Sequence, residues 1–270
     1  MRNSITPLGS LCILAIYLAF AAPCRAQNAD GGESEADLAN QLSNPVASLI
    51  SVPFQNNLDF GSNSSTRIRW LMNVQPVIPF TLNQNWNLIT RTIMPVQFRE
   101  MGSPTDDLFG LGDTSESLFL SPRGGSIIWG VGPIVQVPTA TETALGSGKL
   151  SMGPTAVVLQ QNSGWTYGVL ANQLWSVAGH DKRPGVNATF LQPFLVYNWK
   201  SGFGLGLNTE TTYDWNAGQA TVLINVFATQ VLKIGTQPIS IQGGVRYYAA
   251  RPNGGPDWGL RLALVLLFPK

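Results

Sequence analysis

The chain has 270 residues, and only 11% of them are charged, against roughly 25% in an ordinary soluble domain. Its apolar share of 44% is normal, and its net charge of +1 excludes a basic nucleic-acid surface or an acidic solvating tail. Low charge without excess hydrophobicity disfavours a dispersed soluble protein and indicates a chain with one face towards lipid.

Residues 1–26 have the organisation of a secretory signal peptide. Arg2 supplies a positive charge, and the apolar run at 11–22 precedes small residues and a cleavage site after residue 26. This run is too short to span a bilayer, and no later apolar run reaches about 18 residues. Acylation of Cys24 is the alternative, although Pro23 stands where a small residue is usual. Both cysteines lie in this segment, so the mature chain would contain no disulfide.

Residues 27–49 form a separate N-terminal segment. Acidic residues precede the run 38–42, and Pro45 ends it, which predicts a short helix with negative charge near its start. We expect this segment either to lie in the periplasm or to enter the following structure as a plug.

From residue 50 onward, apolar and polar residues alternate with a period of two, which is typical of half-buried strands. The segments 68–80 and 203–213 show this alternation, and the last segment shows it most clearly. One of its faces carries Leu260, Leu262, Leu264, Leu266 and Phe268, and the other carries Gly259, Arg261, Ala263, Val265 and Leu267. One face is therefore apolar, while the opposite face carries glycine and charged residues.

Twelve such segments are predicted, each about 10 to 14 residues long, which suits a strand that crosses a bilayer at a tilt. They lie at 50–60, 66–80, 86–99, 109–121, 126–138, 150–161, 165–177, 187–199, 203–215, 220–233, 237–249 and 257–268. Tight turns alternate with longer links, and tryptophans fall near segment ends, as in outer-membrane barrels. A sheet in lipid must close on itself. The prediction is therefore an all-β fold: a transmembrane antiparallel up-and-down β-barrel of about twelve strands over 50–270.

Several stretches carry a resemblance to a known family. They are 45–57, 75–79, 110–113, 138–139, 145–149, 153–154 and 258–270. Together they resemble the bacterial outer-membrane proteins of the phenol-degradation meta-pathway (MetA-type) family, often labelled transporters or neuromedin U, over nearly all of 36–270. The resemblance implies an outer-membrane barrel that takes up small solutes, aromatic or hydrophobic compounds among them. It implies no catalytic residue.

Polar side chains are expected on the inward face of the barrel. They are Arg67, Arg69, Asn73, Gln75, Arg91, Asp113, Gln136, Asn172, Gln192, Asn208, Glu210, Asp214, Gln242, Arg246 and Arg261. One interpretation is a path that selects solutes by charge and hydrogen bonding. The other is a network of ion pairs and amides that fills the barrel and holds it rigid. The two can coexist, and glycines on the same face favour a cavity.

Two further stretches are candidates for a phosphate-binding loop and for part of a catalytic triad, and neither fits its motif. Residues 146–149 superficially resemble a phosphate-binding loop, but Thr143 and Leu150 break the pattern, so a hairpin loop is expected. His180, the only histidine, lies in a charged, glycine-flanked stretch, which disfavours a catalytic triad.

We therefore expect a non-enzymatic protein of the bacterial outer membrane that forms a narrow channel or binding site for small solutes. The alternatives are an outer-membrane lipid-modifying enzyme and a structural barrel with an occluded lumen. The expected partners are membrane lipid and a small-molecule solute, with no nucleic acid, no cofactor and no metal. The oligomeric state is left open.

Overall fold

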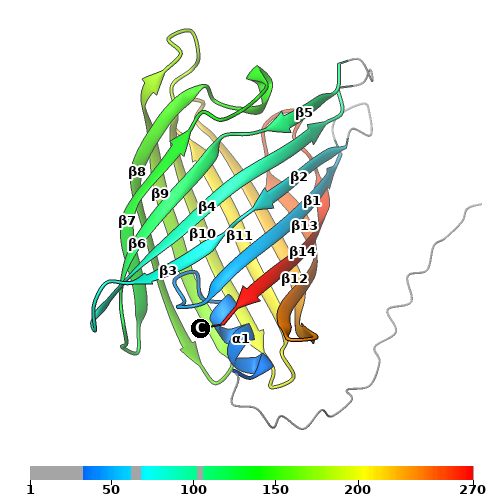
Figure 1. Ribbon diagram of the computed structural model, residues 1–270. Helices are drawn as coiled ribbons and strands as arrows, with labels where there is room; N and C mark the ends of the chain where they lie inside the picture. Colours follow the sequence, from blue (N-terminus) through cyan, green and yellow to red (C-terminus); the bar gives the residue numbers. More distant parts are fainter. Residues whose placement is uncertain (1–32, 62–67, 102–105, 270) are drawn as a thin grey trace, which may run out of the picture. The chain divides into compact units, whose positions relative to one another are not determined.

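The strands form one antiparallel sheet whose first and last members meet (Figure 1). The computed structural model describes residues 33–61, 68–101 and 106–269, so the predicted signal peptide lies outside the described residues. In chain order the elements are α1 (Glu35–Leu42), β1 (Ile50–Phe60), β2 (Arg69–Val74), β3 (Val77–Thr81), β4 (Trp86–Arg99), β5 (Leu108–Leu111), β6 (Thr114–Pro122), β7 (Ile128–Val137), η1 (Thr143–Leu145), β8 (Lys149–Asn162), β9 (Trp165–Gly179), β10 (Asn187–Asn198), β11 (Phe203–Asp214), β12 (Gln219–Ile234), β13 (Gln237–Ala250) and β14 (Trp258–Phe268).

Closure of the barrel rests on the pairing of β1 with β14. The two strands are in antiparallel register along their whole lengths, from Ile50 opposite Phe268 to Phe60 opposite Trp258. The sheet is thereby left without a free first or last strand, as hydrocarbon surroundings require. The prediction of a closed antiparallel barrel of about twelve strands with a short N-terminal helix is confirmed.

Two of the twelve predicted strands are interrupted, and this accounts for the two additional strand segments. The predicted strand 66–80 consists of β2 and β3, and its register to β4 is unchanged across the gap. Pro76 lies in that gap and has no N–H to donate to a neighbouring strand. The interruption is therefore local, and β2 and β3 together cross the wall as one strand.

The other interruption changes the register. The predicted strand 109–121 consists of β5 and β6, separated by Gly112 and Asp113. Pairing to β4 shifts by one residue between Ile93 and Val96, which is a β-bulge. The bulge takes Asp113 out of the regular alternation, so a period-two pattern could not assign its direction.

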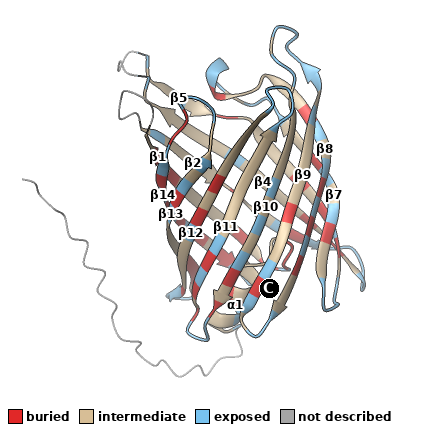
Figure 2. Cartoon of the chain, turned by 180° about the vertical axis from the view of Figure 1, so that it is seen from behind, coloured by how far each residue is buried: buried red, intermediate tan, exposed pale blue. Residues whose placement is uncertain are grey.

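Buried and exposed positions alternate along the strands (Figure 2). On β14, Leu262 is 65% exposed, whereas its neighbours Arg261 and Ala263 are 3% and 6% exposed. On β11, Leu205 and Leu207 likewise face outwards. The outer face is thus an apolar belt, as the sequence predicted for strands in contact with lipid.

The two ends of the barrel differ. One end, here the turn end, carries short connections together with α1 and the last residues of β14 (Figure 1). These connections are 82–85, 123–127, 163–164, 199–202 and 235–236. The opposite end, the loop end, carries the longer links 138–148, 180–186 and 251–257, and also the short link 215–218. In one of the two-residue turns, Ser163 and Gly164 both have positive φ, which matches the strand twist of a two-residue hairpin.

Aromatic side chains pair at both ends of the apolar belt. Trp86 lies 5.8 Å from Trp129 near the turn end, measured between ring centroids. Tyr213 lies 4.7 Å from Trp215 near the loop end. Such girdles mark the two water boundaries of membrane barrels.

A substitution of Leu264 tests whether the apolar belt contacts lipid. Leu264→Arg in the middle of β14 should lower the free energy of unfolding by about 2–4 kcal/mol, because it exposes a charge to hydrocarbon. Urea titration of the barrel in lipid vesicles, followed by its altered gel migration when folded, measures the change. Leu260→Arg, closer to the loop end, is the matched control and should cost only about 0–1 kcal/mol. Equal losses in the two variants would contradict a bilayer centred on this belt.

A candidate binding cavity in the barrel lumen

The segment before β1 lies inside the turn end of the barrel. Ser34 caps the start of α1. Its side chain accepts a hydrogen bond from the Asp37 backbone N–H, and the Asp37 carboxylate accepts one from the Ser34 N–H, which is a capping box. The inner face of this segment is apolar, and it packs against the interior of β12 and β14. The resulting cluster comprises Leu38, Ala39, Leu42, Ala47, Leu49, Val231, Val265 and Leu267.

Polar contacts fix the same segment in place. The Asn198 amide on β10 donates to the Ala39 carbonyl at 3.3 Å, to Asn40 Oδ1 at 3.1 Å and to Ser43 Oγ at 3.0 Å. The Gln161 amide on β8 donates to the Asn40 carbonyl at 2.7 Å. These contacts join the N-terminal segment to strands more than 100 residues later in the sequence.

A cavity of about 430 Å³ lies in the lumen above this segment. Its volume falls within the range of small-molecule sites, roughly 300–1,000 Å³. Its floor is formed by the N-terminal segment, through Ala39, residues 41–45, Ala47 and Leu49. Its wall carries amides and charged groups as well as aromatic and aliphatic groups. The apolar part includes Ile93, Phe119, Ile134, Leu170, Phe190, Phe194, Val196 and Phe227.

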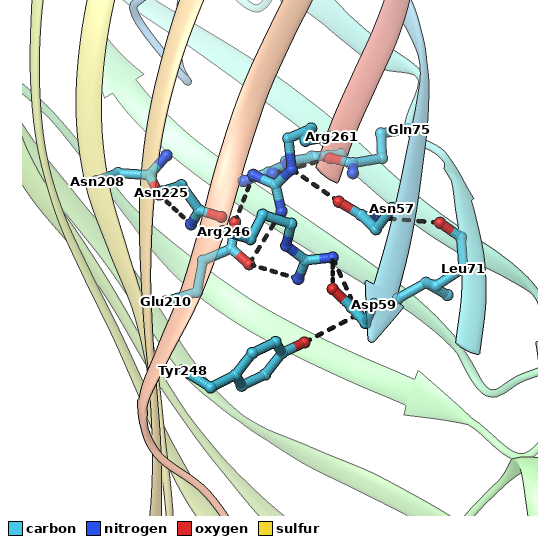
Figure 3. A network of polar contacts seen from close by, with 11 residues as sticks. Asn57, Asp59, Leu71, Gln75, Asn208, Glu210, Asn225, Arg246, Tyr248 and Arg261 are labelled. Atoms are coloured by element: carbon cyan, nitrogen blue, oxygen red, sulfur yellow. Dashed lines mark hydrogen bonds and ion pairs between the residues drawn. The ribbon is translucent and has the colours of Figure 1, made fainter. Parts of the chain in front are cut away.

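An ion-pair network borders the cavity on the side of β11, β13, β14 and β1 (Figure 3). The Arg246 guanidinium lies 3.1 Å from Asp59 Oδ1, and both residues are buried. The Tyr248 hydroxyl donates to Asp59 Oδ2 at 2.9 Å. Because β14 lies between the strands that carry Asp59 and Arg246, this pair spans two strand spacings.

The second half of the network centres on Glu210. Arg261 donates to both Glu210 carboxylate oxygens, at 2.8 and 3.2 Å, and from Nε to Asn57 Oδ1 at 2.7 Å. Arg246 lies 3.9 Å from the same carboxylate. Two arginines therefore pair with two carboxylates. The pair of Arg261 and Glu210 is bidentate, which is the strongest arrangement of such groups.

Glycines create the room for these long side chains. Gly259 on β14 is opposite both Asp59 and Arg246 in the sheet. A Cβ at position 259 would lie 2.2 Å from Asp59 Oδ1. Likewise, a Cβ at Gly244, the partner of Arg261 on β13, would lie 2.7 Å from the Val226 carbonyl oxygen. Gly259 thus leaves the space that the Asp59 carboxylate occupies, and Gly244 allows β12 to approach closely.

Arg91 on β4 stands apart from this network. Its NH2 group donates to Gln75 Oε1 at 3.0 Å, and both residues line the cavity. Across the lumen, the Asn225 amide donates to Asn208 Oδ1 at 2.7 Å. The polar part of the wall thus combines paired charges, amides and one guanidinium bound to an amide.

Most of the inward residues predicted from the sequence line the cavity. They are Asn73, Gln75, Arg91, Asn172, Gln192, Asn208, Glu210, Gln242 and Arg261. Arg246 lies beside them in the ion-pair network.

The other predicted residues lie towards the loop end and serve its connections. Arg69 donates to the Gly254 carbonyl, and Asp214 accepts hydrogen bonds within the 215–218 turn. Asp113 binds the 138–148 loop through Ser147, and Gln136 donates to Asp113. Arg67 lies outside the described residues.

Sequence reasoning missed Asn57, Asp59 and Tyr248, all of which belong to the network. The signal for the first two was available, because they alternate with Leu58 and Phe60 in the first strand. The apolar part of the cavity carried no such signal, since inward Phe and Leu residues look the same in sequence as residues facing lipid.

The two weaker motifs lie in loops of the loop end. Residues 146–148 lie in the link before β8, where Arg183 donates to the Ser147 carbonyl, so the expected hairpin loop is present. The His180 imidazole has no hydrogen bond to a serine or carboxylate within the described ranges. Over the same ranges, no His, Cys, Asp and Glu side chains gather to hold a metal ion. No helix of the described part is long and apolar enough to span a membrane.

A scan against protein-family models found no match, and a search of curated proteins found none either. Solved structures share the fold. An outer membrane channel from Pseudomonas putida F1 is 15% identical, with a TM-score of 0.63 over 82% of this chain and 94% of that one. Outer membrane phospholipase A from Escherichia coli is 13% identical, with a TM-score of 0.47 over 88% and 99%. The chain has the fold of an outer-membrane β-barrel, and its resemblance to the MetA-type family stays a prediction.

Gly259 tests the packing of the ion-pair network. Gly259→Ala should lower the free energy of unfolding by about 1–3 kcal/mol, because the added methyl group displaces Asp59 from Arg246. Denaturant titration of the refolded barrel measures the change. Gly243→Ala on β13 is the matched control, since a Cβ there meets only Leu262 Cδ2, at 3.8 Å. Similar stability of the two variants would contradict a network that depends on this glycine.

Proposed function

We propose that this protein is an outer-membrane channel that carries small solutes through its lumen, past a plug formed by residues 33–49. The observation that carries the proposal is the cavity of about 430 Å³ between the polar wall and this N-terminal segment. Membrane barrels have short turns on the periplasmic side and longer loops outside. The turn end, with the plug, is accordingly assigned to the periplasm, and export would use residues 1–26 as a signal peptide.

The contents of the lumen support a narrow channel. Twelve strands enclose more room than the eight that side chains nearly fill, and less than a sixteen-stranded porin. The polar network and the N-terminal segment reduce this room further, so only small solutes fit. The fold shared with the P. putida outer membrane channel is consistent with transport.

The apolar part of the cavity supports aromatic or hydrophobic solutes. Phe119, Phe190, Phe194 and Phe227 line it, and aromatic rings attract one another in offset or edge-to-face arrangements. This agrees with uptake of aromatic compounds, which is what the MetA-type resemblance implies. Membership of that family is part of the proposal.

The alternative of a lipid-modifying enzyme has less support. A histidine-based hydrolase needs a serine and a carboxylate in hydrogen-bond reach of the imidazole. His180 is exposed in the 180–186 loop, and its backbone N–H donates to the Gly148 carbonyl. The cavity of the lumen does not include it.

Conductance measurements test the channel and its plug together. The full chain should give small, discrete current steps in a planar bilayer. Asn198→Ala combined with Gln161→Ala should give larger or more frequent steps, because it removes the side chains that hold Ala39, Asn40 and Ser43.

The control variant is Asn162→Ala, which changes an exposed amide at the end of β8 and should conduct like the unaltered protein. Silence of both the full chain and the double variant, with the barrel shown to be folded, would contradict a channel. That result would favour a structural barrel with an occluded lumen.

A further inference from the structure

We infer that the cavity binds a small amphipathic anion, with its carboxylate at Arg91 and its apolar body against the phenylalanines. This inference rests on the proposed function and names the class of solute. It begins with the charges around the cavity. Among the described residues, the polar wall and its network carry the carboxylates of Asp59 and Glu210 and the guanidiniums of Arg91, Arg246 and Arg261. Three cations therefore face two anions.

The surplus positive charge belongs to Arg91. Arg261 holds Glu210 with two hydrogen bonds, and Arg246 lies 3.1 Å from Asp59. Glu210 acts on Arg91 only through space, since no ion pair within 4.0 Å joins Arg91 to a carboxylate of the described chain.

The Arg91 guanidinium has hydrogen-bond donors that its one hydrogen bond in the described structure leaves free. A guanidinium has five N–H donors in a planar fork that matches a carboxylate. The one hydrogen bond of Arg91 in the described structure goes to the neutral Gln75 amide. A charge withdrawn from water is costly unless it is paired. The side chain is half-buried on the cavity wall, so an anion in the cavity can reach it.

The neighbours of Arg91 in the sheet are the side chains that the apolar body of the ligand would contact. Arg91 pairs in register with Val77 on β3 and Ser117 on β6. The next inward position on β4 towards the turn end is Ile89, opposite Phe119, and both belong to a buried apolar cluster. Phe190 and Phe194 pack against this cluster and line the cavity.

Arg91 therefore lies beside Gln75 and directly next to apolar side chains of the wall. A neutral hydrophobic solute would leave its charge unpaired, and a small inorganic anion would leave the phenylalanine surface unfilled. A ligand with one carboxylate on a compact apolar body satisfies both parts at once. Aromatic monocarboxylates have this shape and charge.

Equilibrium binding of two matched fluorescent probes tests the inference on the refolded full chain. The probes are 1-naphthoate and the neutral 1-naphthylmethanol, which have the same ring system. We expect naphthoate to bind about tenfold more tightly or better, since a charge-assisted hydrogen bond forms only with the carboxylate. Equal affinities for the two probes in the unaltered protein would overturn the inference, and this comparison needs no variant.

Substitution of Arg91 locates the contact. Arg91→Gln should reduce the affinity for naphthoate about tenfold, to that for the alcohol, and leave the affinity for the alcohol unchanged. Arg69→Gln removes the same charge at the loop end, where Arg69 donates to the Gly254 carbonyl, and should change neither affinity. Loss of naphthoate preference in both variants would place the effect in the overall charge and overturn the assignment to Arg91.

A conservative variant covers the case in which Arg91→Gln does not fold. Arg91→Lys keeps the charge but loses the planar fork, so it should retain the preference for naphthoate at reduced strength. Failure of this inference is distinguishable from failure of the proposed channel. A barrel that prefers naphthoate but does not conduct supports the binding site and contradicts the channel. A barrel that conducts but does not prefer naphthoate supports the channel and contradicts the binding site.

Discussion

The pairing of β1 with β14 is the constraint on which the rest of this structure depends. Backbone N–H and C=O groups cannot be left unpaired in hydrocarbon, so a sheet in lipid has to close. The register from Ile50–Phe268 to Phe60–Trp258 achieves closure without a bulge. The same register places Asn57 and Asp59 beside the strand that carries Arg261, and the strand that carries Arg246 lies on the far side of that one. Closure thus assembles the ion-pair network as well as the wall.

Closing about twelve strands also creates an interior that has to be filled. The polar and the apolar inward surfaces are filled in different ways. Towards the loop end, paired charges reach over glycines such as Gly259 and satisfy one another. At the turn end, the apolar interior of β12 and β14 is covered by the segment before β1, through Leu38 and Leu49. Removal of the N-terminal segment would expose apolar side chains to water, and removal of one partner of an ion pair would leave a buried charge unpaired.

The strands could be predicted from sequence because each is half exposed to lipid, and the alternation of Leu260 to Phe268 follows directly from that. The bulge at Gly112–Asp113 could not, because a register shift depends on which loop the Asp113 carboxylate binds. The apolar inner surface was also missed. A period-two pattern separates polar from apolar residues, whereas an inward Phe119 and an outward Phe109 differ only in what surrounds them.

The apolar lumen links the plug to the proposed ligand. Val46 of the N-terminal segment belongs to the same buried cluster as Ile89 and Phe119, and these two residues lie next to Arg91 in the sheet. Phe119 also lines the cavity, so the proposed solute would contact a side chain against which the N-terminal segment packs. Because two groups cannot cover one surface at the same time, movement of the proposed solute further towards the turn end would require the segment around Val46 to leave this cluster.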